Sequence, residues 1–147
     1  IISDPTGSSD MISRAMYEEF DLPYMTRLIH ALKHIGVKIM IHACGNYTDR
    51  LDMLAATGAD GLSLDTKVDL GHARSVLGNR ICIMGNVDPS GIMLNGSPED
   101  VKQKSIAAME KAGKHGAMIL SAGCQIPRDT PAQNVEAMVR TAREFRL

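Results

Sequence analysis

The stretch Val37-Lys38-Ile39-Met40-Ile41-His42-Ala43-Cys44-Gly45-Asn46 joins an apolar strand to two side chains that can bind metal. Alternate residues of a strand point to the same face, so His42 and Cys44 would present an imidazole and a thiol side by side. Gly45 and Asn46 follow at once and end the strand. We therefore expect the pair at the mouth of a strand, where it is accessible.

A third candidate ligand, Cys124, follows another apolar run at residues 117–120. Zinc accepts one nitrogen and two sulfur ligands and keeps a fourth position open in catalytic sites. The plainer interpretation is that cysteines are among the most buried residue types and simply fill the core. Cys82, inside a strand, receives that interpretation. For His42, Cys44 and Cys124, the sequence alone gives a metal site and a structural role about equal weight.

Strand and helix patterns alternate five times along the chain with short connections, which is typical of parallel βα units. A (β/α)₈ barrel needs about 250 residues, so we predict an α/β fold that is the C-terminal half of such a barrel. An open doubly wound sheet is the alternative, but no glycine-rich phosphate fingerprint follows any strand. The predicted strands are residues 1–4, 37–42, 60–64, 80–84 and 117–120; the predicted helices are about 10–35 with a break near Pro23, 47–57, 70–77, 98–114 and 132–145.

The carboxyl ends of barrel strands carry the chemistry of such enzymes. Seven polar residues fall at these predicted ends: Asp4, His42, Cys44, Asp65, Asn86, Asp88 and Cys124. Aspartate is also common in turns and caps. We expect a site role for at least one of the three aspartates.

The chain has 147 residues, a net charge of -1 and only three cysteines. This composition predicts one domain over residues 1–147, in a reduced cytoplasmic compartment, without nucleic-acid or membrane partners. Ile1 lies in the tail of a strand, which indicates a piece of a longer barrel. A half barrel has two unpaired edges, so we expect this piece alone to be inactive or to form a homo-oligomer.

Several motifs together resemble the C-terminal half of the uroporphyrinogen decarboxylase superfamily, and within it the cobalamin-dependent methyltransferases of the methylcobamide:coenzyme M type. The motifs are Asp4-Pro5 to Ser13, Pro23-Tyr24, His42-Ala43-Cys44-Gly45-Asn46, residues 57–65, Gly85-Asn86-Val87-Asp88-Pro89, and Gly123-Cys124 with Pro127, Pro131 and Asn134. The histidine, the nearby cysteine and the distant cysteine are the most specific part.

The resemblance implies zinc-dependent transfer of a methyl group from a methylated corrinoid to a small thiol such as coenzyme M. It implies that His42, Cys44 and Cys124 bind the zinc. A thiol with a pKa near 8.5 is mostly protonated at neutral pH, and zinc would deprotonate it. The chain contains no Asp-x-His-x-x-Gly corrinoid-ligand motif, so the corrinoid is expected on a separate carrier protein.

The remaining polar strand ends receive roles by the same resemblance. Asp65 and Asp88 are candidates for catalytic residues that line the pocket or occupy the fourth zinc position, and Asn86 and Asp4 are candidates for cofactor binding. Two alternatives stay open: a metal-free decarboxylase of tetrapyrrole carboxylates, and a non-catalytic domain with a structural zinc.

Overall fold

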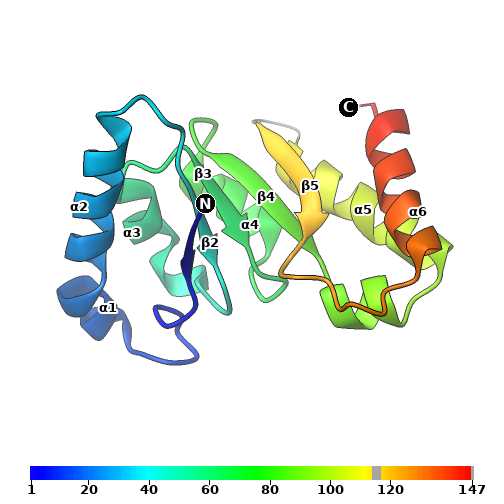
Figure 1. Ribbon diagram of the computed structural model, residues 1–147, viewed down its shortest axis with the longest axis horizontal. Coiled ribbons are helices and arrows are strands. Elements are labelled where there is room, and N and C mark those ends of the chain that lie inside the picture. Colours follow the sequence, from blue (N-terminus) through cyan, green and yellow to red (C-terminus); the bar gives the residue numbers. More distant parts are fainter. Residues whose placement is uncertain (114–116, 147) are drawn as a thin grey trace.

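The computed structural model describes residues 1–113 and 117–146, and five parallel strands form its centre (Figure 1). The strands are β1 (Ile2–Asp4), β2 (Met40–Ala43), β3 (Gly61–Leu64), β4 (Cys82–Val87) and β5 (Met118–Ala122). Their order in the sheet is their order in the chain, with β1 and β5 at the edges. The predicted fold, five parallel strands alternating with helices as in part of a (β/α)₈ barrel, is confirmed.

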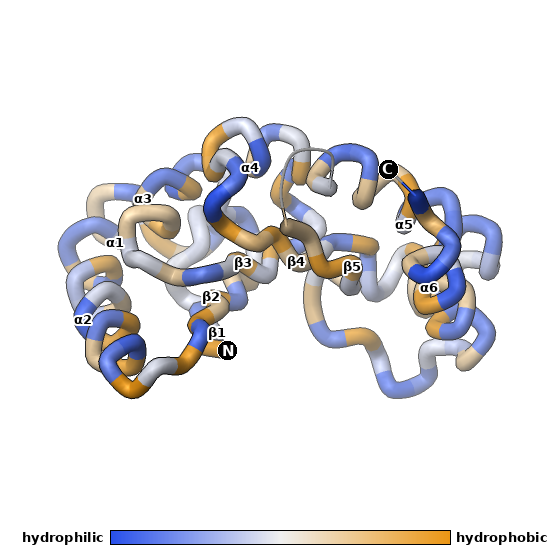
Figure 2. Tube along the Cα trace, turned by 90° about the horizontal axis from the view of Figure 1, so that it is seen from above, coloured by the Kyte–Doolittle hydropathy of each residue, from blue (hydrophilic) through white to orange (hydrophobic). Residues whose placement is uncertain are grey.

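The helices cover one face of the sheet. In the view of Figure 2 the strands follow an arc, and the helices lie along its outer side. They are α1 (Arg14–Phe20), α2 (Leu22–Lys33), α3 (Leu51–Ala56), α4 (Leu70–Leu77), α5 (Pro98–Gly113) and α6 (Ala132–Glu144), with a 3₁₀ turn η1 (Thr48–Arg50) and a short π-helix η2 (Pro89–Leu94). The inner side of the arc is therefore the face on which a barrel site would lie.

Helix boundaries follow local signals in the sequence. The expected helix over residues 10–35 is two helices that meet at Asp21, with Pro23 in the first turn of α2; proline is tolerated there because the first N–H groups lack helical partners. The expected end of α5 at Lys114 lies outside the described residues. The π-helix η2 was not predicted; the side chain of Asp88 caps it by accepting the N–H groups of Ser90 and Gly91.

Along β2 and β3, side chains that face the hydrophobic core alternate with side chains that face the candidate site. Ile41, Leu62 and Leu64 are fully buried in the main hydrophobic cluster. Because neighbouring residues of a strand point to opposite faces, His42 and Ser63 face the inner side of the arc. The strands thus place apolar side chains beneath the helices, and His42 and Ser63 toward the concave face.

None of the helices within the described ranges is long and apolar enough to cross a membrane.

Candidate metal centre

The side chains of His42, Cys44 and Cys124 meet at the carboxyl ends of β2 and β5. The Sγ atoms of the two cysteines are 3.8 Å apart, and Cys124 Sγ is 3.6 Å from His42 Nε2. One potential ligand atom from each residue lies within 4.8 Å of the other two. Both cysteines are free and half-buried. The three residues expected to share a site are therefore adjacent.

These distances agree with the geometry that a tetrahedral zinc ion requires. Zinc–sulfur bonds of about 2.3 Å and zinc–nitrogen bonds of about 2.05 Å, at tetrahedral angles, place two sulfur ligands about 3.8 Å apart and a sulfur about 3.6 Å from a nitrogen. The observed separations match both values. The donor set and its spacing thus fit zinc, with three protein ligands.

The turn after β2 is held by the loop after β3. Gly45 has a positive φ of 97°, a conformation that favours glycine. Its N–H donates to Asp65 Oδ2 over 3.1 Å, while the N–H of Lys67 donates to Asp65 Oδ1 over 3.1 Å. Asp65 therefore fixes the turn that carries Cys44 through Oδ2, while Oδ1 orders the loop of Asp65 itself.

The other predicted site residues lie at the same edge of the sheet but are not brought to the three ligands. Asp88 Oδ1 accepts the N–H groups of Ser90 and Gly91 and caps η2. The amide of Asn86 donates to the carbonyls of Asp65 and Val68, at 2.9 and 2.7 Å. Both residues line a separate cavity of about 430 Å³ between α4 and α5.

Asp4 is buried at the end of β1. Its Oδ1 accepts the N–H of Gly7, and its carbonyl accepts the hydroxyl of Tyr47. Within the described residues, Asp4 Oδ2 is buried without a hydrogen-bond partner.

The three ligands line a cavity of about 410 Å³ on the concave face. Ser63, Met84 and Gln125 also line it, although no motif in the sequence marks them as site residues. Ser63 accepts or donates a hydrogen bond at His42 Nδ1, over 3.0 Å. The alternation of β3 already placed Ser63 on the polar face, but only the register between β2 and β3 sets it beside His42.

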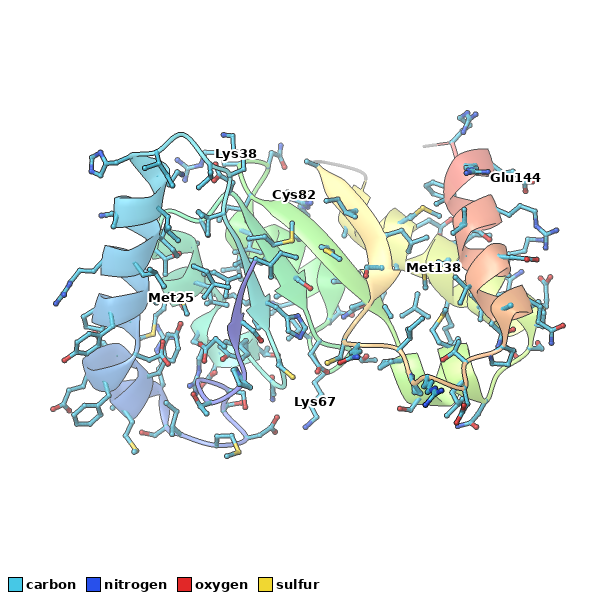
Figure 3. The ribbon with its side chains drawn as sticks, viewed as in Figure 1. Met25, Lys38, Lys67, Cys82, Met138 and Glu144 are labelled. Atoms are coloured by element: carbon cyan, nitrogen blue, oxygen red, sulfur yellow. The ribbon has the colours of Figure 1, made fainter. Side chains whose placement is uncertain are left out.

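The surroundings of Cys44 oppose ionisation of its thiol when no metal is bound. Burial raises the pKa of Cys44, and so do the hydrogen bond to Cys124 and the negative charge of Asp65; the charge of Lys67 acts in the opposite direction. Lys67 lies beyond the carboxyl ends of the strands (Figure 3) and pairs with Asp10, at 2.9 Å. A cation between the two sulfurs would reverse this balance, because it stabilises thiolates directly.

Comparison with known proteins assigns the chain to a family. The profile of the uroporphyrinogen decarboxylase (URO-D) family matches residues 1–145. The chain belongs to this family. Two kinds of URO-D relative are similar to it: the methylcobamide:CoM methyltransferase MtbA of Methanosarcina acetivorans, 38% identical over 99% of the chain, and the uroporphyrinogen decarboxylase of Trichodesmium erythraeum, 37% identical over 88%.

A solved structure agrees with the fold. A methyltransferase from Methanosarcina mazei superposes with a TM-score of 0.87 and 28% identity, over 98% of this chain and 41% of that one. The chain also spans only 41% of the length of the Methanosarcina acetivorans relative and 36% of the length of the Trichodesmium one. It therefore corresponds to about two fifths of these proteins.

Proposed function

We propose that the chain is the zinc-binding part of a methyltransferase that moves a methyl group from a methylated corrinoid to a small thiol such as coenzyme M. The observation that carries this proposal is the cluster of His42, Cys44 and Cys124 with the spacing of a tetrahedral zinc site. The 38% identity to MtbA supports it at the level of the family. The domain would be part of a longer (β/α)₈ barrel.

His42, Cys44 and Cys124 would hold the zinc and leave its fourth position for the sulfur of the substrate. A substrate sulfur bound at this position would be kept deprotonated and reactive at neutral pH by the zinc. Methyl transfer would release the proton of the thiol to solvent and replace it by a methyl group, and the electron pair of the methyl–cobalt bond would stay with the corrinoid of the carrier. The corrinoid would come from a separate carrier protein that docks over the open ends of the strands.

Among the candidate acids, a role for Asp65 is supported by its contacts with the Cys44 turn. Its negative charge raises the pKa of Cys44, and its carboxylate accepts the N–H groups of Gly45 and Lys67. We propose that it keeps the Cys44 turn in place while substrate enters. Catalytic or cofactor-binding roles for Asp88, Asn86 and Asp4 stay predictions.

A decarboxylase of tetrapyrrole carboxylates is the second candidate, because a decarboxylase is 37% identical to the chain.

The full-length protein, reconstituted with zinc under reducing conditions, should methylate coenzyme M from methylcobalamin and leave uroporphyrinogen unchanged. Cys44→Ser should abolish methyl transfer, whereas Cys82→Ser should retain it, because Cys82 lies inside β4 and outside the cluster. Decarboxylation that survives Cys44→Ser would contradict the proposal.

A further inference from the structure

Parallel pairing aligns one row of side chains across the concave face. The register pairs Ser3 with His42, His42 with Ser63 and Ser63 with Met84. His42 therefore lies between two serines of equal size, one on β1 and one on β3. Residues in register on adjacent strands point to the same face and lie within side-chain contact.

Among the described residues of this row, His42 has a short hydrogen bond to Ser63 on β3 and none to Ser3 on β1. The Oγ of Ser63 lies 3.0 Å from His42 Nδ1, and Ser63 is only 5% exposed. The opposite ring nitrogen, Nε2, faces Cys124 Sγ at 3.6 Å. Each nitrogen of the imidazole thus has its own partner, and the two partners lie on opposite sides of the ring.

The protonation of one ring nitrogen decides what the other can do. In a neutral imidazole one nitrogen carries a proton and the other has a lone pair. Only the tautomer with Nδ1–H leaves a lone pair on Nε2, directed at the two sulfurs. Metal-binding histidines commonly have their second nitrogen fixed by such an outer hydrogen bond, which sets both tautomer and ring orientation.

We propose that Ser63 is a positioning residue that accepts the Nδ1–H of His42 and so keeps the Nε2 lone pair directed at Cys44 and Cys124. The metal part of this inference rests on the proposed function, but the tautomer does not. The hydroxyl is a fixed partner, because Ser63 is buried and could not turn away from His42 without leaving its oxygen unpaired. Its removal would free the ring to rotate and to exchange its proton between the two nitrogens.

The first test is ¹⁵N NMR of the histidine rings in the full-length, metal-free protein, above the pH range in which histidine titrates. The wild type should show His42 with a protonated Nδ1 and an unprotonated Nε2. Ser63→Ala should give a mixture of the two tautomers. Ser3→Ala, on the other side of the same row, should leave the His42 signals unchanged. A wild-type His42 that is protonated at Nε2 would overturn the proposal even if Ser63→Ala fails to fold.

The second test measures the zinc affinity by competition with a chelator. Ser63→Ala should bind zinc about 10- to 100-fold more weakly, and Ser63→Thr, which keeps the hydroxyl, should recover most of the affinity. Circular dichroism of each variant checks that the fold is intact. If the wild type binds zinc and Ser63→Ala binds it equally well, the positioning role is wrong. If the wild type binds no zinc, the proposed function fails, while the NMR result still decides the role of Ser63.

Discussion

The Sγ atoms of Cys44 and Cys124 lie 3.8 Å apart although 80 residues separate them in the chain. Cys44 follows β2 and Cys124 follows β5, and two further strands lie between these. In a flat sheet, three strand spacings would separate β2 and β5 by about 14 Å. The curvature of the sheet, together with the two turns after the strands, therefore builds the site.

Gly123 is where the Cys124 turn passes closest to the loop after β3. A Cβ at Gly123 would lie 2.6 Å from both the backbone nitrogen and the Oγ1 of Thr66. Gly123→Ala must therefore push these loops apart, and we expect it to cost about 1–3 kcal/mol of stability and to weaken zinc binding. Urea unfolding and a zinc titration measure the two effects.

Gly71→Ala is the matched control for Gly123→Ala. Gly71 lies in α4, where an added Cβ would meet Oδ1 of Asp69 at 3.1 Å, the oxygen that caps this helix, and no atom of either cysteine turn. This variant should bind zinc like the wild type. Equal zinc binding by Gly123→Ala and Gly71→Ala would show that the Cys124 turn does not need its close packing.

Asp60 predicts a dependence of stability on pH. The N–H of Ile39 donates to its carboxylate, and this bond, together with Lys38 and Lys33, lowers the pKa of Asp60 to about 2. A carboxyl that titrates lower in the folded state than in the unfolded state stabilises the protein above the unfolded pKa, near 3.9. That stabilisation is lost as the pH falls from about 4 to about 2.

Asp60→Asn should therefore be less stable than the wild type by roughly 1 kcal/mol at pH 7, a modest value because the ion pairs are partly exposed to solvent, which screens them. The difference should shrink as the pH falls toward 2. Asp129→Asn, in an exposed turn, serves as the control and should be as stable as the wild type. Thermal unfolding at several pH values checks this, and a difference that persists at pH 2 would rule out the explanation.

Arg74 joins α4 to the segments on either side of β4. This side chain is 6% exposed. Its guanidinium donates to the carbonyls of Ala112, Gly78, Ile81 and Ala117. Arg74→Met keeps much of the apolar length but leaves these carbonyls without their donor, so we expect a loss of about 3 kcal/mol in urea unfolding. Arg140→Met, at an exposed position, is the control and should change stability little. Equal stability of the two variants would mean that water replaces the hydrogen bonds that Arg74 makes to these carbonyls.

The order of elements could be predicted from the sequence because each boundary has a local signal. Pro23 marks the break in the first helical region and Gly36 marks its end. The apolar runs before His42 and Cys124 differ clearly from the polar residues around them. The rule that parallel strands share one carboxyl edge predicted that His42, Cys44 and Cys124 lie at the same rim, and the family resemblance implied that they form one ligand set.

What could not be predicted depends on register and tertiary contacts. Ser63 reaches His42 only through the pairing of β2 with β3. Asp88 and Asn86 share the carboxyl edge with the three ligands, yet their side chains are engaged with η2 and with the loop after β3. Position along the chain gives the edge of the sheet, but it does not give the direction in which a side chain points.

The most direct test of the account is the zinc content of the full-length protein, purified under reducing conditions and measured by elemental analysis. We predict about one zinc per chain in the wild type and in Cys82→Ser, and none in Cys44→Ser or Cys124→Ser, because each removes one of three ligands. A folded wild-type protein that takes up no zinc, or two cysteine variants that both retain it, would contradict the central claim.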